Sequence, residues 1–320
     1  MGKIDFLAIG DTAIDDFIRL KDARVNCDIN DENCTITMRF ADKIPFESST
    51  VVYGVGNAAN AAVAAARLGF ASGLVTNIGD DDRGDQVIEH FEKEGVDLKF
   101  ATRHKNSPTN YHYVLWYESD RTILVNHYRY PYAFPEGLGE PKTVYLSSLG
   151  EGTEKYHEAL ADWLDAHPNI SFVFQPGTFQ MKLGVEKLSR LYKRANLFFA
   201  NKEEYQRILN VRTSDVPILL KEMREKGPKL PFLTDGRKGT YVLNESGEVE
   251  HREMFPDPAP PFSRTGAGDA FSSTTTAYLA MGYSLKDAML RGTINAAYVV
   301  QKVGAQEGLL TKAELESKLT

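Results

Sequence analysis

Segments with strand propensity and segments with helical periodicity alternate along the middle of this 320-residue chain. A first buried strand is predicted at 3–10, and strand and helix pairs follow from about position 74. These pairs are 74–78 with 83–93, 144–146 with 154–166, 171–174 with 184–193, and 197–199 with 202–209. Because successive parallel strands are joined by crossover helices, the alternation predicts a three-layer α/β/α fold, in which helices cover both faces of a mostly parallel central sheet.

A second group of predicted strands interrupts this alternation. The run YHYVLWY at 111–117 and the run at 121–127 are rich in β-branched and aromatic residues and share a short polar link, which is typical of a hairpin. Short alternating runs such as CTITMRF favour further small strands. We expect these strands to form a small β-sheet lid on a single domain, 1–320, with lid insertions at about 16–53 and 100–131.

The charge of the chain excludes some classes of partner. The chain has 37 Lys and Arg against 44 Asp and Glu, a formal net charge of −7, with 42% hydrophobic residues. This globular composition excludes a disordered tail protein, a collagen-like fibre and a cysteine-stapled miniprotein. An acidic chain has no electrostatic footprint for nucleic acid or an anionic membrane, so phosphate groups must be bound locally, by backbone amides or a few cations.

The cysteines and the most apolar segment bear on the compartment. Cys27 and Cys34 are the only cysteines, and without neighbouring histidines they cannot form an ordinary zinc site, so we expect free structural thiols. No charged and apolar leader follows Met1, which favours a cytoplasmic protein without oxidative folding. The alanine-rich segment 56–75 contains two asparagines and an arginine, which indicates a packed helix rather than a membrane span.

The sequence RTGAGDAF at 264–271 predicts an anion-binding site. Small residues lead directly into a predicted helix, so the amides of Gly266, Ala267 and Gly268 can converge on an anion at the positive end of that helix. Asp269, in the first helical turn, is placed to deprotonate a hydroxyl that attacks a phosphoryl group. An acid at this position also stabilises the helix dipole, which is the alternative interpretation of Asp269.

The sequence TGAGDAF resembles the C-terminal signature of the ribokinase-like (PfkB) carbohydrate kinases, and GNAANAAVAAARLG at 56–69 is similar to their N-terminal signature. The resemblance extends over nearly the whole chain and implies the ribokinase-like fold. It also implies that Asp269 is the catalytic base, that 266–268 form the anion hole, and that Gly56 and Asn60 contact sugar hydroxyls. A helix-capping or turn role is the alternative for Asn60.

Two further segments imply how a nucleotide is bound. The resemblance of ANKEEY to a family motif implies that Asn201 and Glu204 bind the cofactor, with Glu204 holding magnesium and the phosphates through water. The sequence TDGRKGTYV is similar to the family's nucleotide-binding turn, in which glycines let the backbone approach phosphate. The expected ligands there are Thr234, Gly236 and Gly239, together with Thr265 before the anion hole. Taken singly, these patterns are also typical of a solvated helix and a hairpin turn.

The sequence GDTAID after the first strand contains the candidate carboxylates for the substrate. Asp15 matches the family's N-terminal substrate carboxylate, which implies that it accepts two hydrogen bonds from substrate hydroxyls, and Asp11 is a second candidate. The same segment lacks the G-x-G-x-x-G turn of a dinucleotide-binding fold, which argues against a dinucleotide oxidoreductase.

Departures from the family pattern concern the sugar and a monovalent cation. Val55 replaces the first glycine of a pair near the N-terminal signature, so we expect sugar positioning to differ. Ser263 and Arg264 stand where the family commonly has an aspartate followed by a small residue, and in ribokinase that aspartate belongs to a monovalent-cation site. Potassium dependence is therefore not expected. Arg264 is either a fixed positive charge near the nucleotide phosphates or a solvent-facing loop residue.

The resemblance thus implies a kinase that uses ATP and Mg²⁺ to phosphorylate a hydroxyl of a small carbohydrate. Two alternatives remain open: a nucleoside kinase of the same superfamily, whose base would stack on the aromatic residues of 111–117, and a non-catalytic sugar or nucleotide sensor. The intact TGAGD sequence argues against the sensor. Apolar alternation in the lid strands favours a homodimer through the lid. The sequence leaves the acceptor and the phosphorylated hydroxyl undetermined.

Overall fold

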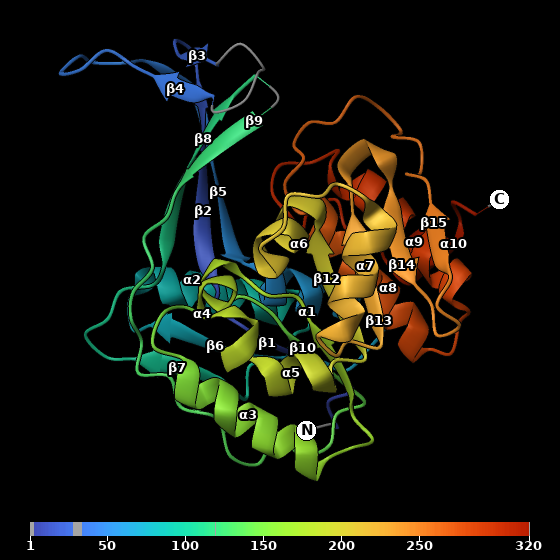
Figure 1. The fold of residues 1–320 in the computed structure, drawn as a ribbon. Coiled ribbons are helices and arrows are strands. Elements are labelled where there is room, and N and C mark those ends of the chain that lie inside the picture. Colours follow the sequence, from blue (N-terminus) through green and yellow to red (C-terminus); the bar gives the residue numbers. More distant parts are fainter. Residues whose placement is uncertain (1–2, 28–33, 119, 320) are drawn as a thin grey trace.

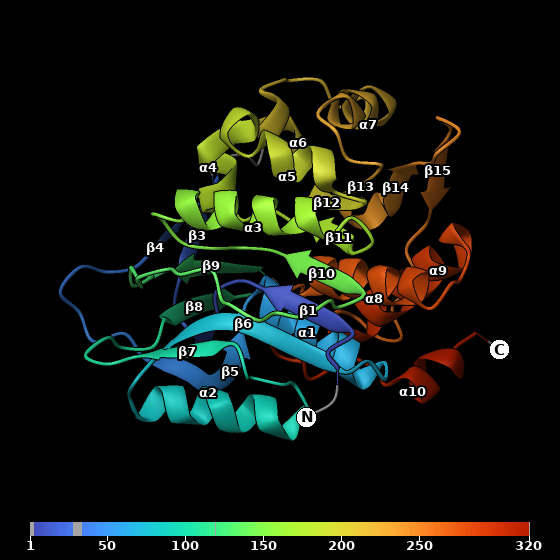
Figure 2. The same cartoon turned by 90° about the horizontal axis from the view of Figure 1, so that it is seen from below.

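A large, mostly parallel sheet forms the centre of the protein (Figures 1 and 2). The computed structural model describes residues 3–27, 34–118 and 120–319, and within them nine strands follow the order β15-β14-β13-β12-β11-β10-β1-β6-β7. The pairs β13–β14 and β14–β15 are antiparallel and the other neighbouring pairs are parallel, so β14 runs opposite to the other strands of this sheet. The strands are β1 (Phe6–Ile9), β6 (Ser72–Gly79), β7 (Ala101–His104), β10 (Thr143–Leu146), β11 (Ser171–Phe174), β12 (Leu197–Asn201), β13 (Leu230–Thr234), β14 (Thr240–Leu243) and β15 (Val249–Arg252).

Helices cover both faces of this sheet, as Figure 2 shows. One face carries α1 (Asn57–Arg67), α2 (Asp82–Lys93), α8 (Ala267–Ala280) and α9 (Leu285–Val299), with α10 (Lys312–Glu316) beyond them. The other face carries α3 (Glu154–Ala166), α4 (Thr178–Lys187), α5 (Ser189–Arg194), α6 (Lys202–Leu209) and α7 (Val216–Glu225). The predicted three-layer fold is confirmed. Within the described ranges, no helix combines the length and apolar character needed to span a membrane.

The residue types explain why these elements form and how closely they pack. Strand β1, FLAI, is buried at every residue, as expected for a central parallel strand that is covered on both faces. The alanines of α1 let this helix lie close to the sheet and to α8, and at Gly10 an added Cβ would come within 2.7 Å of the Cβ of Ala58. The range 184–193, predicted as one helix, is divided at Leu188 between α4 and α5, and α4 begins earlier than predicted, at Thr178. Gly184, with φ +84°, interrupts the helical conformation within α4.

A smaller sheet stands beside the large one and forms the lid (Figure 1). Its strand order is β5-β2-β8-β9, with β2 (Ala13–Leu20), β5 (Phe46–Val55), β8 (Tyr111–Tyr117) and β9 (Asp120–Leu124). Strand β2 pairs antiparallel with β5 and parallel with β8, so segments far apart in the chain meet in this sheet. Strand β7 lies inside the segment 100–131 but belongs to the large sheet.

The expectation of free thiols is wrong, because Cys27 and Cys34 form a disulfide. Strands β3 (Arg24–Asn26) and β4 (Thr35–Thr37) pair antiparallel, with Asn26 opposite Thr35. Cys27 follows Asn26 and Cys34 precedes Thr35, so this register places the two cysteines opposite one another, with their Cα atoms 4.0 Å apart. The sequence-based argument considered metal ligation and missed the disulfide because it did not pair these two short strands.

Candidate active site

A cleft of about 500 Å³ opens between the carboxyl ends of the parallel strands, the N-terminus of α8 and the lid. This edge of a parallel sheet is where open α/β folds bind their ligands. Most of the candidate residues predicted from the sequence line this cleft: Asp15, Gly56, Asn60, Asn201, Glu204, Thr234, Thr265, Gly266, Gly268 and Asp269. The fold therefore brings together side chains from the first strand after β1, from α1 and from the C-terminal third of the chain.

A second, more apolar cavity of about 150 Å³ adjoins the cleft. The predicted nucleotide ligands Gly236 and Gly239 line it, as does Ala267 of the predicted anion hole, together with apolar side chains such as Phe255 and Val300. Residues shared by the two cavities are Thr234, Arg264, Gly268 and Phe271. The two cavities therefore meet at the first turn of α8, an arrangement that suits a ligand with a flat apolar part and a polar, extended part.

The carboxylate of Asp269 lies at this junction and accepts three hydrogen bonds from amide side chains. Its Oδ1 accepts from Asn57 Nδ2 at 2.9 Å and from Gln175 Nε2 at 3.0 Å, and its Oδ2 accepts from Asn60 Nδ2 at 2.7 Å. Burial raises the pKa of Asp269, while these amides oppose the shift. A carboxylate with a raised pKa is a stronger base than one in water, which suits it to accept a proton from a hydroxyl.

The amides that hold Asp269 are themselves fixed. Tyr145 donates to Gln175 Oε1 at 2.5 Å, so the Gln175 amide nitrogen faces the carboxylate. Gln306 Nε2 donates to Asn60 Oδ1 at 2.9 Å, which sets the orientation of Asn60 in the same way. The side chain of Asn60 therefore does not cap its helix. Its Nδ2 donates to Asp269, and its Oδ1 accepts from Gln306.

Sequence analysis missed two members of this cluster, Asn57 and Gln175. Asn57 is the first residue of α1 and lies inside the motif that pointed to Asn60. Gln175 follows directly after β11, at the carboxyl end of a parallel strand. Its place at a strand end was the signal that could have found it, because ligand and catalytic groups gather at that edge.

The N-terminus of α8 presents unpaired backbone amides to the junction of the two cavities. Helix α8 begins with Ala270 N donating to Gly266 O at 2.8 Å, which leaves the amides of residues 267–269 without an intrahelical acceptor. Among the described residues, no side chain caps this helix. Gly266 has φ +84°, and a Cβ there would lie 2.5 Å from the Cα of Ala305, so the turn requires glycine. A Cβ at Gly268 would meet nothing within 4 Å, so the backbone is open to a ligand on that side.

Asn201 and Glu204 form a capping box at the start of α6. Asn201 Oδ1 accepts from Glu204 N at 2.8 Å, and Glu204 Oε2 accepts from Asn201 N at 2.8 Å. Burial raises the pKa of Glu204, and the nearby charge of Asp269 adds to this shift. One Glu204 oxygen therefore has a structural role in this state. Nearby, Lys202 Nζ lies 2.7 Å from Asp235 Oδ1 and ties α6 to the glycine turn that lines the smaller cavity.

At the lid end of the cleft, Asp15 is paired with a histidine that the sequence had suggested only as a stacking residue. His112 Nδ1 lies 3.1 Å from Asp15 Oδ1, and the His112 ring stacks on His127 with centroids 5.0 Å apart. Of the five aromatic residues of 111–117 considered for stacking on a base, only His112 lines the cleft. Trp116 instead packs against Phe262, and Tyr113 is exposed on the lid.

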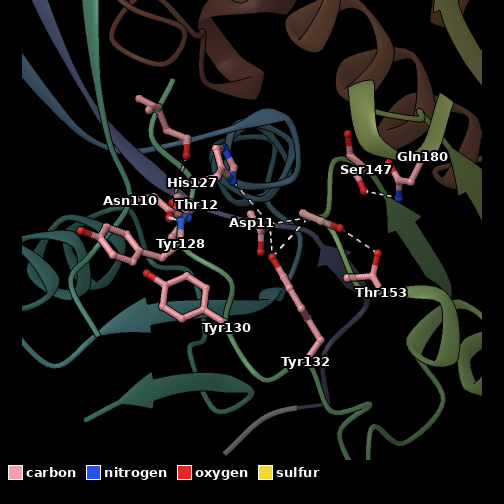
Figure 3. A network of polar contacts seen from close by, with 12 residues as sticks. Asp11, Thr12, Asn110, His127, Tyr128, Tyr130, Tyr132, Ser147, Thr153 and Gln180 are labelled. Atoms are coloured by element: carbon pink, nitrogen blue, oxygen red, sulfur yellow. Dashed lines mark hydrogen bonds and ion pairs between the residues drawn. The ribbon is translucent and has the colours of Figure 1, made fainter. Parts of the chain in front are cut away.

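Asp11, the second predicted substrate carboxylate, does not line the cleft and lies in a separate buried network (Figure 3). Its Oδ2 accepts from Tyr132 Oη at 2.6 Å and from Gly150 N at 2.7 Å, while His127 Nδ1 lies 3.9 Å away. Burial raises the pKa of Asp11 to about 6, although the hydrogen bonds from Tyr132 and Gly150 lower it. These contacts hold the segments after β9 and β10 against the end of β1.

Replacing Asp11 by Asn removes this titration. Because the folded-state pKa is raised from 3.8 to about 6, the bound proton stabilises the fold fully below the unfolded pKa, and this stabilisation is lost as the pH rises through about 6. Between about pH 3.5 and pH 7, we expect the unfolding free energy of the wild type to fall by on the order of 3 kcal/mol relative to Asp11→Asn. Urea unfolding followed by tryptophan fluorescence measures the difference; parallel pH curves for the two proteins would contradict the assignment.

Comparison with known proteins identifies the family. The model of the pfkB family carbohydrate kinases matches residues 23–312. The chain is 26% identical to a ribokinase of Bacillus subtilis over 83% of this chain and 87% of that protein, and 23% identical to a nucleoside kinase of Methanothermobacter thermautotrophicus over 99% and 96%. The structure of Arabidopsis thaliana ribokinase complexed with ribose and ATP has a TM-score of 0.79, with 15% identity, over 100% of this chain and 99% of that one.

The match to the family model and the names of these relatives define a phosphotransferase that acts on hydroxyl groups. The chain belongs to the pfkB family of carbohydrate kinases.

Proposed function

We propose that this protein transfers the γ-phosphoryl group of ATP to a hydroxyl of a small carbohydrate bound in the 500 Å³ cleft. The observation that carries the proposal is the position of Asp269, whose partly buried carboxylate adjoins the uncapped amides of α8 where the two cavities meet. A base beside an anion-binding backbone is what phosphoryl transfer to a hydroxyl requires.

The acceptor is assigned to the lid end of the cleft, where Asp15 and His112 present polar atoms beside Gly56. Asp15 and Asn60 are the side chains offered to its hydroxyls, and an acceptor that binds there has to displace or share the Asn60 contact with Asp269. Asp269 takes the proton of the attacking hydroxyl as the new bond to phosphorus forms. The amides of residues 266–268 stabilise the charge on the phosphoryl oxygens, since donors fixed in advance need no reorganisation during the reaction.

The nucleotide is assigned to the adjoining cavity. Its apolar walls suit a purine base, and Gly236, with no atom within 4 Å of an added Cβ, leaves the turn after β13 open to phosphate. Among the described residues, no group of three acidic, histidine or cysteine side chains could hold a metal. Glu204, which lines the cleft, is the side chain that would bind magnesium through water, which fits an ion that retains waters and takes other ligands from phosphates. Magnesium would neutralise phosphate charge there.

A nucleoside kinase is the second candidate, because a protein of that name aligns with 99% of this chain. The cleft supports it less, since four of the five aromatic residues expected to stack on a base do not line it. A sugar needs hydroxyl acceptors such as Asp15, whereas a nucleoside also needs a flat apolar subsite at the lid end.

An ADP-release assay across ribose, fructose, keto-deoxy sugars, inositol and nucleosides tests the function. We expect turnover with one or a few of the sugars and polyols, because the lid end of the cleft is polar and contains a paired carboxylate. Turnover with nucleosides alone would favour the second candidate, and no product with any acceptor would contradict both.

The variant Asp269→Asn tests the role of the base in the same assay. The variant keeps the side-chain shape but cannot take the proton, so we expect turnover to fall by about 10²- to 10⁴-fold, with nucleotide binding nearly unchanged. Turnover close to that of the wild type would remove Asp269 from the role of base.

We further propose that activity does not depend on potassium. At the position where the family commonly has an aspartate, Ser263 Oγ donates to Thr265 Oγ1 at 3.0 Å, so this loop is held by a neutral hydroxyl pair instead of a carboxylate. Rates in potassium chloride and in tetramethylammonium chloride at equal ionic strength should agree within about twofold, since no carboxylate at that position attracts the cation. Strong activation by potassium would contradict this proposal.

We also propose a homodimer through the lid. The sheet register places Val51 and Tyr113 on either side of Asp16, and Leu124 next to Tyr113, so their side chains share one face of the lid, opposite the face of Asp15 and His112. These three apolar side chains are 38–51% exposed. Light scattering at micromolar concentration should give twice the mass of one chain, and Leu124→Lys should reduce it to that of a monomer. A monomeric mass for the wild type would rule out this interface.

We also propose that the protein is cytoplasmic. A kinase that consumes ATP works where ATP is available, which supports the cytoplasm. Disulfides are rare there, so the Cys27–Cys34 bond is the feature that argues against it.

A further inference from the structure

Arg264 lies in the loop before α8 and lines both cavities of the active site. Of the described residues that line both cavities, it is the one cationic residue. Among the described residues, no carboxylate or carbonyl oxygen is hydrogen-bonded or ion-paired with its guanidinium, although most other arginines of this chain are paired in that way. An exposed, unpaired guanidinium at the meeting point of two ligand cavities is available to a ligand that spans both.

Carboxylates outnumber cationic side chains around Arg264. Asp15, Glu204 and Asp269 line the cleft together with Arg121, and Asp257 lines the smaller cavity. A polyphosphate that enters this space meets these carboxylates in a chain with a net charge of −7. Backbone amides supply only partial positive charges, so a full positive charge at the junction has a large electrostatic effect on such a ligand.

The loop that carries Arg264 is anchored on both sides of it. Phe262 N and Ser263 N donate to Val300 O at 2.8 and 3.1 Å, and Thr265 N donates to Ser263 Oγ at 3.2 Å. Ser263 is 6% exposed, so its side chain is held inside the protein while the neighbouring Arg264 side chain points out into the cavities. The backbone of Arg264 is thereby fixed just before the first turn of α8, and only the side chain needs to be ordered when a ligand binds.

We propose that Arg264 binds the β- and γ-phosphoryl oxygens of the nucleotide and stabilises the phosphoryl group during its transfer. This inference rests on the proposed kinase function. In the step that it assists, the bond between the acceptor oxygen and the γ-phosphorus forms, the bond from that phosphorus to the β,γ-bridging oxygen breaks, and the acceptor proton goes to Asp269. ADP leaves with the bridging oxygen, and the guanidinium contacts the oxygens on which negative charge accumulates.

Arginine suits this position better than lysine. The planar guanidinium can give two parallel hydrogen bonds to phosphate oxygens, whereas a lysine ammonium acts as a point charge on a flexible stem. Arg264→Lys therefore retains the charge and loses the geometry, and Arg264→Ala loses both. The two variants separate the contribution of charge from that of bidentate binding.

Calorimetric titration with ADP, AMP and adenosine, each with magnesium, tests the contact without an acceptor. For Arg264→Ala we expect the ADP dissociation constant to rise about 10-fold, as for the loss of a hydrogen bond between charged groups. The constants for AMP and adenosine should stay within about twofold, because the lost contact lies beyond the α-phosphate. With an acceptor identified, turnover should fall about 100-fold, and Arg264→Lys should lie between the variant and the wild type.

Arg212→Ala is the matched control, because Arg212 is also exposed and lines neither cavity. It should leave binding and turnover unchanged. Equal affinity of Arg264→Ala and wild type for ADP would overturn the proposal and make Arg264 a solvent-facing residue. An equal loss of affinity for all three ligands would also overturn it, since the effect would then lie in the cavity as a whole. If the wild type phosphorylated no acceptor, the kinase function would fail while the titrations still decided the role of Arg264.

Discussion

The active site depends on one partly buried carboxylate and the three amide side chains that hold it. Asp269 sits in the first turn of α8, and its partners come from α1 and from the end of β11. A buried charge is costly unless it is hydrogen-bonded, so Asn57, Asn60 and Gln175 make this position tolerable for an acid. The close packing of α1 against α8 is therefore part of the chemistry as well as of the fold, and the small alanine side chains of α1 permit it.

The lid gives the protein two different surfaces on one small sheet. Alternate residues of a strand point to opposite faces, so β2 places Asp15 toward the cleft and Asp16 away from it. The neighbouring strand repeats the division, with His112 in the cleft and Tyr113 exposed. Because a shift of one residue in register would exchange the two faces, the pairing of β2 with β8 determines both the substrate side of the lid and its outer surface.

Much of the fold followed from local patterns. The alternation of strands and helices, the helix with bounds near 56–69 and the hairpin at 111–127 all depend on periodicity and composition within short windows, and the structure contains them. Asp269, Gly266 and Gly268 could be predicted in the same way, because they lie within one short motif. Gln175, the pairing of Cys27 with Cys34, and the burial of Asp11 were not found, since each depends on a neighbour supplied by another strand or loop.

The sequence by itself determined the family, the three-layer architecture and the identity of the acid at the head of a helix, because these are written in contiguous motifs and in hydrophobic periodicity. The tertiary structure alone decided which of the candidate acids reach the cleft, and it separated Asp15, which lines it, from Asp11, which is buried with Tyr132. It also placed Arg264 where the two cavities meet. The physical reason is that burial and charge environment are sums over neighbours far apart in the chain, and no short window of sequence contains them.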